Sequence, residues 1–201
     1  MVALYFSKNM IHFRYNPLKT VQAVALLLKL HGKPMNYMGL LKLLYMADRI
    51  ALQSINQPIS GDDYFSMNFG PVLSHVYDAI KNKDSGEPKE IWEKHISTRD
   101  QNYQHTKNYD IQLLTDPGDS ELSESEEDII KNVYASYGKL DQFYLADLTH
   151  QYFPEWQYPD GRATPISVES VLINVGKNAE EIAEIEQEVA QENYLDVILA
   201  E

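Results

Sequence analysis

The sequence predicts an α+β protein that is mainly α-helical, with a small antiparallel β element and an acidic C-terminal helix. Apolar residues recur over most of the chain at the three- and four-residue spacing of helices, between recognisable capping residues. Residues 92–114 instead alternate apolar and polar side chains imperfectly, which is typical of short strands. From residue 178 onward, eight acidic residues accompany an apolar stripe, with no Lys or Arg.

Length, composition and net charge limit the kinds of protein that this chain could be. The 201 residues, 44% of them hydrophobic, suffice for one domain with a real core. No apolar run reaches the roughly 18 residues of a membrane span, so we expect a cytoplasmic protein without a membrane partner. The absence of cysteine excludes disulfides and thiolate metal sites. The net charge of −13 argues against direct nucleic-acid binding, which needs clustered cations. It either favours a basic protein partner or simply keeps the protein soluble.

The first two helices are predicted from their caps. Asn16 caps a helix with Pro17 in its first turn, and Gly32 ends it. Asn36 caps the second helix, which extends to about Ile55. The residues that share its inner face are Leu40, Leu43, Leu44, Ala47 and Ala51.

Asp48 falls among apolar neighbours of this second helix, where a carboxylate needs hydrogen-bond donors or a cation. We expect it to accept hydrogen bonds from the turn at residues 61–64 and so to support the fold. Arg49 is not expected to pair with it, because adjacent helix residues do not face each other. The alternative is that both residues bind a partner or a ligand.

The middle of the chain is predicted to mix strand and helix. Residues 61–70 form a turn and a short strand, and Pro71 begins a helix that extends to Ile80. Residues 81–88 are polar and turn-rich, which predicts a surface loop. Residues 92–114 then form two or three antiparallel strands.

The second half opens with a strong helix signal. Ser123 and Glu126 form a capping box before an apolar run, and Gly138 ends that helix. Asp141 caps a short helix that extends through Leu148.

An aromatic loop at residues 153–162 follows. Thr164 and Pro165 are predicted to begin another helix, which Gly176 closes. The last helix covers residues 178–199.

Four blocks, in this order, resemble the Panacea domain, also called the SocA-like domain. They are Leu-Leu-Tyr-Met-Ala-Asp-Arg at 43–49; Pro-Ile-Ser-Gly-Asp-Asp-Tyr at 58–64 with Phe-Gly-Pro-Val at 69–72; Leu-Ser-Glu-Ser-Glu at 122–126; and Leu-Thr-His at 148–150 with a tryptophan after it. The residues that match the family motifs, in structural or partner-binding roles, are Tyr45, Asp48, Arg49, Gly61, Asp62, Tyr64, Gly70, Pro71, Tyr77, Thr149, His150 and Trp156.

The resemblance implies a compact, mainly helical domain, here residues 1–177, and an antitoxin of bacterial or phage origin. Such a protein neutralises a cognate toxin, often encoded by an adjacent gene, through direct protein–protein binding and without catalysis or a cofactor. Homo-oligomerisation stays open. Two features depart from the family: no basic helix-turn-helix segment is present, and the acidic helical appendage at 178–201 has no counterpart in the shared core.

Other functions are weighed against this one. The protein could be an adaptor that presents a partner to a protease, or a hydrolase or transferase that uses Asp48 and His75. No nucleophile beside a base and no glycine-rich phosphate loop supports catalysis. His95 and His105 could face each other across a hairpin, but no metal-ligand spacing is present, so no metal site is predicted.

Two segments carry alternative interpretations. The aromatic residues of 143–158 form either an interaction surface or the edge of the core. The acidic terminal helix either packs on the domain as a solvated amphipathic helix or contacts a basic toxin, in the second case by steering association or by mimicking nucleic acid.

Overall fold

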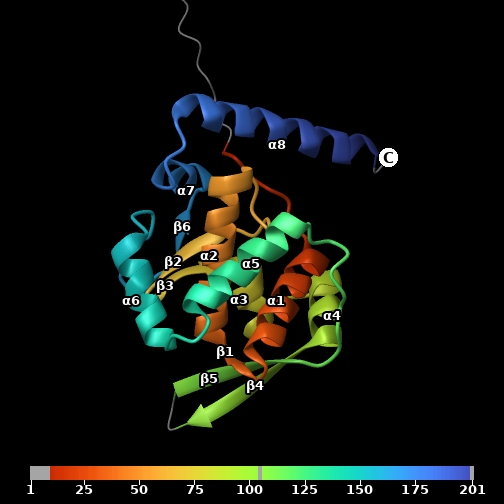
Figure 1. The fold of residues 1–201 in the computed structure, drawn as a ribbon, viewed down its shortest axis with the longest axis vertical. Coiled ribbons are helices and arrows are strands. Elements are labelled where there is room, and N and C mark those ends of the chain that lie inside the picture. Colours follow the sequence, from red (N-terminus) through yellow and green to blue (C-terminus); the bar gives the residue numbers. More distant parts are fainter. Residues whose placement is uncertain (1–9, 104–105, 200–201) are drawn as a thin grey trace, which may run out of the picture.

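The computed structural model describes residues 10–103 and 106–199, and its mainly helical α+β architecture confirms the predicted fold class (Figure 1). Eight helices lie in this part of the chain: α1 Pro17–His31, α2 Tyr37–Ile55, α3 Ser74–Ile80, α4 Gly86–His95, α5 Glu124–Tyr137, α6 Gln142–Tyr152, α7 Val168–Asn174 and α8 Ala179–Leu199. Its strands are β1 Met35–Asn36, β2 Tyr64–Met67, β3 Gly70–Leu73, β4 Ile96–Tyr103, β5 Thr106–Leu113 and β6 Thr164–Ile166.

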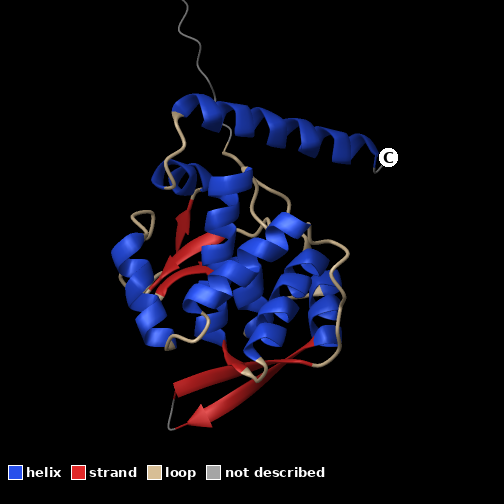
Figure 2. Cartoon of the chain, in the orientation of Figure 1, coloured by secondary structure: helices blue, strands red, loops and turns tan. Residues whose placement is uncertain are grey.

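The strands form two antiparallel sheets at different places in the molecule (Figure 2). The first has the order β1-β5-β4, in which Met35 pairs with Ile111. This sheet confirms the predicted antiparallel element and takes its third strand from the residues just before α2. The second has the order β3-β2-β6, in which Tyr64 lies between Leu73 and Ile166.

Helix α2 occupies the centre of the core, in contact with α1, α5, α6 and β3 (Figure 1). All five residues of its predicted inner face are buried, and so are Leu41, Tyr45 and Leu52 on the adjacent stripe. A helix that is apolar on most sides belongs inside the protein, because each buried leucine contributes roughly 1.5–3 kcal/mol relative to exposure. The side chains that α2 projects are therefore surrounded by other elements.

The predicted caps are present. Asn16 accepts a hydrogen bond from the backbone of Lys19 at 3.0 Å, and Asn36 accepts one from Met38 at 2.9 Å. Both halves of the capping box between Ser123 and Glu126 form at the start of α5. These local signals were sufficient because each cap bonds only within its own turn.

The prediction that Pro71 begins a helix is wrong. Pro71 lies in β3 opposite Ser66, and α3 begins only at Ser74. Gly70 has φ of 98°, which is outside the helical region, and pairing with β2 supplies the backbone partners of this segment. The helix starts where the Asp62 carboxylate accepts the N–H groups of its first turn.

The loop predicted at 81–88 and the strand predicted from Trp92 are both partly wrong, because α4 covers Gly86–His95. Trp92 is buried on this helix and lies at helical spacing from His95, which is also buried. The strand begins at Ile96, directly after the helix. The short apolar spacing here fits either structure, and packing against α1 and α3 selects the helix.

The helix predicted to begin at Thr164 and Pro165 starts later. These residues belong to β6, where Pro165 pairs with Phe65 at the edge of the sheet, a position that tolerates the missing N–H of proline. Ser167 is the true cap of α7 and accepts a hydrogen bond from Ser170 at 3.2 Å. Helix α6 also extends beyond Leu148, to Tyr152.

Helix α8 lies across one end of the molecule, above α7 (Figure 1). Ile185 and Val189 are buried, and the Asn193 amide donates to the carbonyl of His12 at 3.2 Å. The acidic helix thus packs on the domain along part of its length; the boundary between 1–177 and 178–201 stays a prediction. Among the described residues, no helix is both long and apolar enough to cross a membrane.

Candidate functional site: a buried polar network beside an aromatic surface

Asp48 is the centre of a buried hydrogen-bond network. Its Oδ1 accepts the backbone N–H groups of Ile59 at 3.0 Å and Ser60 at 3.1 Å. Its Oδ2 accepts the hydroxyl groups of Ser60 and Tyr64, the latter at 3.0 Å. The expected hydrogen bonds to the turn are therefore present, although the donors begin at Ile59, before Gly61. Asp48 holds this loop against α2.

Asp62 is a second carboxylate that, like Asp48, accepts hydrogen bonds from backbone N–H groups. It is buried, and its carboxylate accepts the N–H groups of His75 at 2.9 Å and Val76 at 3.1 Å. A carboxylate at this position favours the start of α3, because it accepts hydrogen bonds from N–H groups of the first turn and its negative charge is attracted by the positive end of the helix dipole. Burial raises the pKa of Asp62 to about 7, with the nearby Asp48 as a further cause. Burial likewise raises the pKa of Asp48 to about 6 against its hydrogen bonds.

These raised pKa values predict a pH dependence of stability. In the unfolded chain both carboxyl groups titrate near 3.8, so between that pH and about 7 the folded state binds more protons. The contribution of these two carboxyl groups to the free energy of unfolding then falls as pH rises through this window. We expect a higher melting temperature at pH 5 than at pH 7, measured by circular dichroism.

Asp62→Asn should reduce this slope, whereas Asp128→Asn, at an exposed carboxylate on α5, should leave it unchanged. Equal slopes in the wild type and in Asp62→Asn would contradict the assignment to Asp62.

A second network joins α2 to the loop after α6. Arg49 Nε donates to Glu155 Oε1 at 2.8 Å, and the Tyr45 hydroxyl donates to the same oxygen at 3.1 Å. The Arg49 guanidinium also lies 4.6 Å from the ring centre of Phe153. Arg49 thus pairs with Glu155 and not with Asp48, as its position on the helix predicted. Sequence reasoning missed Glu155; the signal was an acidic residue between Pro154 and Trp156 in the aromatic loop.

Lys42 is a third polar residue of α2, and sequence reasoning missed it as well. It is 1% exposed, and its ammonium donates to the carbonyl of Pro71 at 2.6 Å. Burial lowers its pKa to about 7. Gly70 fits beside it only as glycine: a Cβ there would stand 2.3 Å from Thr149 Oγ1 and 3.0 Å from Lys42 Cε. The β2–β3 turn is therefore held tightly against α2 and α6.

The motif residues Thr149, His150 and Trp156 lie on α6 and in the loop that follows it. The ring of His150 stacks on that of Trp156, with 3.8 Å between their centres, and Trp156 Nε1 donates to the carbonyl of Met67 at 2.9 Å. Thr149 Oγ1 donates to the carbonyl of Ala146 at 2.7 Å within α6. Burial, followed by the charge of Lys42, lowers the pKa of His150. Helix α6 and its following loop are thus joined to the β2–β3 hairpin.

Comparison with known proteins decides the family. The family model described as antitoxin SocA-like, Panacea domain matches residues 40–157, which is more than half of the chain. The chain belongs to the Panacea family. The searches of curated proteins and of solved structures returned no match.

The matched region of this Panacea domain contains all twelve predicted motif residues. Most of them connect elements: Asp48 and Tyr64 join α2 to the loop and to β2, and Tyr45 and Arg49 join α2 to Glu155. Tyr77 lies on α3, half-buried against the core. The described contacts are those of a structural signature, and whether any of these residues also contacts a partner stays a prediction.

The geometry does not support Asp48 and His75 as a catalytic pair. Asp48 is 2% exposed and both of its oxygens accept hydrogen bonds from the fold. The His75 ring stacks on Tyr15 instead, with 4.3 Å between ring centres. A general base must reach the proton that it abstracts, and Asp48 has no open path to a substrate.

Of the two histidines that could face each other across a hairpin, His105 lies outside the described residues. His95 is buried at the end of α4, where its Nδ1 lies 2.9 Å from Thr115 Oγ1. Across residues 10–103 and 106–199, no three His, Cys, Asp or Glu side chains gather in a group that could hold a metal ion.

Four exposed aromatic side chains lie on α6 and on the adjoining β2–β3 turn, which α6 contacts. We call them the aromatic surface: Phe69 in the turn and Phe143, Tyr144 and Tyr152 on α6, all between 53% and 60% exposed. Phe69 and Phe143 contact each other edge to face, with 6.4 Å between ring centres. The aromatic side chains of Phe143, Tyr144 and Tyr152 on α6 thus lie largely outside the core.

An apolar pocket of about 320 Å³ opens beside α6 at one edge of the aromatic surface. Met46, Ile50 and Leu148 contribute apolar walls, and Tyr152 stands at its edge. Arg49 also lines this pocket, on the side where it pairs with Glu155. The buried network therefore fixes a wall of a surface pocket.

Proposed function

We propose that this Panacea-domain protein is an antitoxin that neutralises a cognate toxin by direct protein–protein binding at the aromatic surface. The observation that carries the proposal is the group of half-exposed aromatic side chains along α6 beside an apolar pocket. Family membership supports the antitoxin role. The toxin is encoded by an adjacent gene, and the complex forms in the cytoplasm.

The chemistry of this surface suits a protein partner. Aromatic side chains supply much of the binding energy of protein interfaces, because they bury a large area at a small entropic cost. Water-exposed Phe and Tyr in one place are otherwise unfavourable on a monomer. A pocket of about 320 Å³ accepts one or two apolar side chains of a partner. The toxin would thus place an apolar side chain beside Arg49 while α6 covers its working surface.

Charge supports a basic toxin. Asp141 and Asp147 are the charged residues on the exposed side of α6 and its cap, and both are acidic. The chain as a whole carries a net charge of −13. Such a field accelerates association with a basic partner, and the acceleration weakens as salt increases.

Co-expression with the adjacent reading frame tests the proposal. We expect the neighbouring gene to arrest growth when expressed alone and growth to recover when this protein is co-expressed. Immunoblotting for the toxin should show unchanged toxin levels, because occlusion leaves the toxin intact. Absence of a toxic neighbour rescued by this protein would refute the antitoxin role, and a fall in toxin level would favour delivery to a protease.

A further inference from the structure

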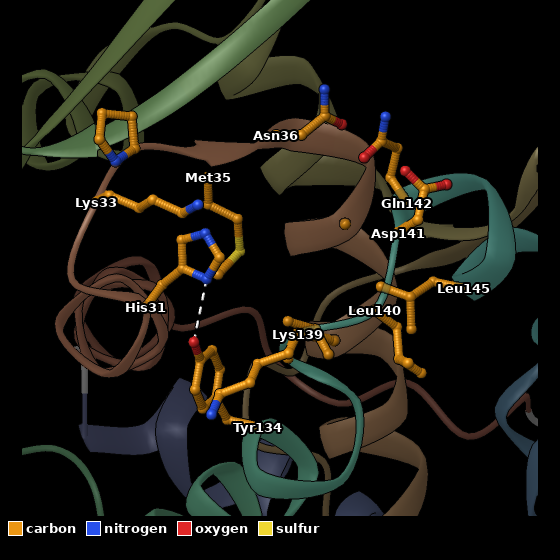
Figure 3. A pocket seen from close by; sticks show the side chains of 14 residues that line it. His31, Lys33, Met35, Asn36, Tyr134, Lys139, Leu140, Asp141, Gln142 and Leu145 are labelled. Atoms are coloured by element: carbon orange, nitrogen blue, oxygen red, sulfur yellow. Dashed lines mark hydrogen bonds between the residues drawn. The ribbon is translucent and has the colours of Figure 1, made fainter.

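A second pocket is built between three separate segments (Figure 3). Its volume is about 590 Å³, within the range of small-molecule sites. The end of α1, the start of α2 and the α5–α6 turn each contribute walls. Met35, Leu43 and Leu145 are buried and form an apolar floor.

One wall is held in place by a glycine. The Tyr134 hydroxyl lies 3.1 Å from His31 Nδ1, which joins α5 to the end of α1 across the pocket wall (Figure 3). Tyr134 can take this position only because Gly138 has no side chain: a Cβ on Gly138 would stand 2.3 Å from the Tyr134 ring. The wall is therefore a packed structure and not an incidental gap between loops.

Positive charge gathers at this pocket in an otherwise acidic protein. Lys33, after α1, and Lys139, after α5, both line it from different segments. Neither ammonium forms an ion pair with any carboxylate in the part of the chain that the structure describes. Asp141 is the one carboxylate among the lining residues, and its Oδ1 accepts the N–H groups of Phe143 at 2.8 Å and Tyr144 at 3.4 Å.

We propose that this pocket binds a small phosphate monoester of mononucleotide size, with its phosphate attracted by Lys33 and Lys139, which stand on either side of the His31–Tyr134 pair (Figure 3), and its organic part over the apolar floor. A phosphate monoester carries a charge of about −1.5 to −2 at neutral pH, which matches two lysines. Lysine binds phosphate as a point charge, so the pair needs no rigid geometry. The buried leucines and the Gln142 side chain then contact the organic part.

This site is distinct from the proposed toxin contact, although α6 connects them. Gln142 at the start of α6 lines the pocket, and Phe143 and Tyr144 follow directly on the aromatic surface. Binding is measured on the isolated protein without a toxin. Failure of the antitoxin role therefore leaves this proposal standing, and failure of this proposal leaves the antitoxin role standing.

The test is isothermal titration calorimetry of the full chain with AMP, inorganic phosphate and adenosine as probes. We expect AMP to bind at least about tenfold more tightly than either of the others, because only AMP supplies both the charge and the apolar body. Lys33→Gln with Lys139→Gln should weaken AMP binding by about tenfold or more. The matched control is Lys94→Gln with Lys131→Gln, which removes two exposed lysines outside the pocket.

Four outcomes would overturn the proposal. They are no AMP binding at millimolar concentration, equal affinity for AMP and inorganic phosphate, equal affinity for AMP and adenosine, and an equal loss of binding in the control variant. The first denies a site, the second denies a role for the apolar floor, and the third denies a role for the lysines. An equal loss in the control variant would show that AMP binding depends only on the net charge of the protein and not on the lysines of this pocket.

Discussion

Replacing Asp48 with alanine is expected to lower the free energy of unfolding by about 4 kcal/mol, because several buried donors would lose their acceptor together. Those donors are the N–H groups of Ile59 and Ser60 and the hydroxyls of Ser60 and Tyr64. Each buried donor without a partner costs about 1–3 kcal/mol, and partial access of water reduces the sum. Urea denaturation followed by circular dichroism measures the change.

Asp128→Ala, on the exposed side of α5, is the matched control and should change stability by less than about 0.5 kcal/mol. The loss of stability in Asp48→Asn should lie between the losses in Asp48→Ala and Asp128→Ala. The amide oxygen of asparagine still accepts hydrogen bonds, but its NH₂ group, itself a donor, faces other donors. An Asp48→Ala protein with unchanged stability but lost toxin binding would show that Asp48 contacts the partner and does not support the fold.

The second large effect is expected in toxin binding. Phe143→Ala with Tyr144→Ala should weaken binding on the order of 100- to 1,000-fold, because central aromatic residues of an interface each contribute about 2 kcal/mol or more. Both side chains are more than half exposed, so folding should be nearly unaffected. Surface plasmon resonance with the purified toxin measures the affinity, and growth rescue reports the same loss in cells.

Tyr194→Ala with Leu195→Ala is the control, since these residues on α8 are 67% and 54% exposed and lie away from α6. We expect this variant to keep both binding and rescue. If the α8 variant lost toxin binding and the α6 variant kept it, the toxin would contact the acidic helix, and the aromatic surface would be refuted as the contact.

The buried networks explain how one helix can serve both stability and function. Three polar residues of α2 each hold a different segment: Lys42 holds the β2–β3 hairpin, Asp48 the loop before β2, and Arg49 the loop after α6. These segments carry or flank the aromatic surface. A change in the core of α2 is therefore expected to displace the surface even where no surface residue is altered.

The limits of sequence-based prediction are clearest at particular residues. Asn16, Asn36 and Ser123 were correctly predicted as caps, because a cap bonds within one turn of its own helix. Pro71 and Pro165 were wrongly predicted as helix starts, because proline is also tolerated in an edge strand, and pairing with β2 decided between the two. Lys42 and Glu155 were missed, since a charged residue inside an apolar run gives no sign of its distant partner.

By itself, the sequence determined the fold class, the main helices, the family motifs and the need of Asp48 for hydrogen-bond donors. All of these depend on local periodicity, local capping or the solvation of a single group. Only the tertiary structure decided which donors reach Asp48, that Arg49 pairs with Glu155, and that the aromatic residues of α6 face water beside a pocket. The physical reason is that these contacts join residues from 11 to 106 positions apart, and the packing of α2 at the centre of the core brings them together.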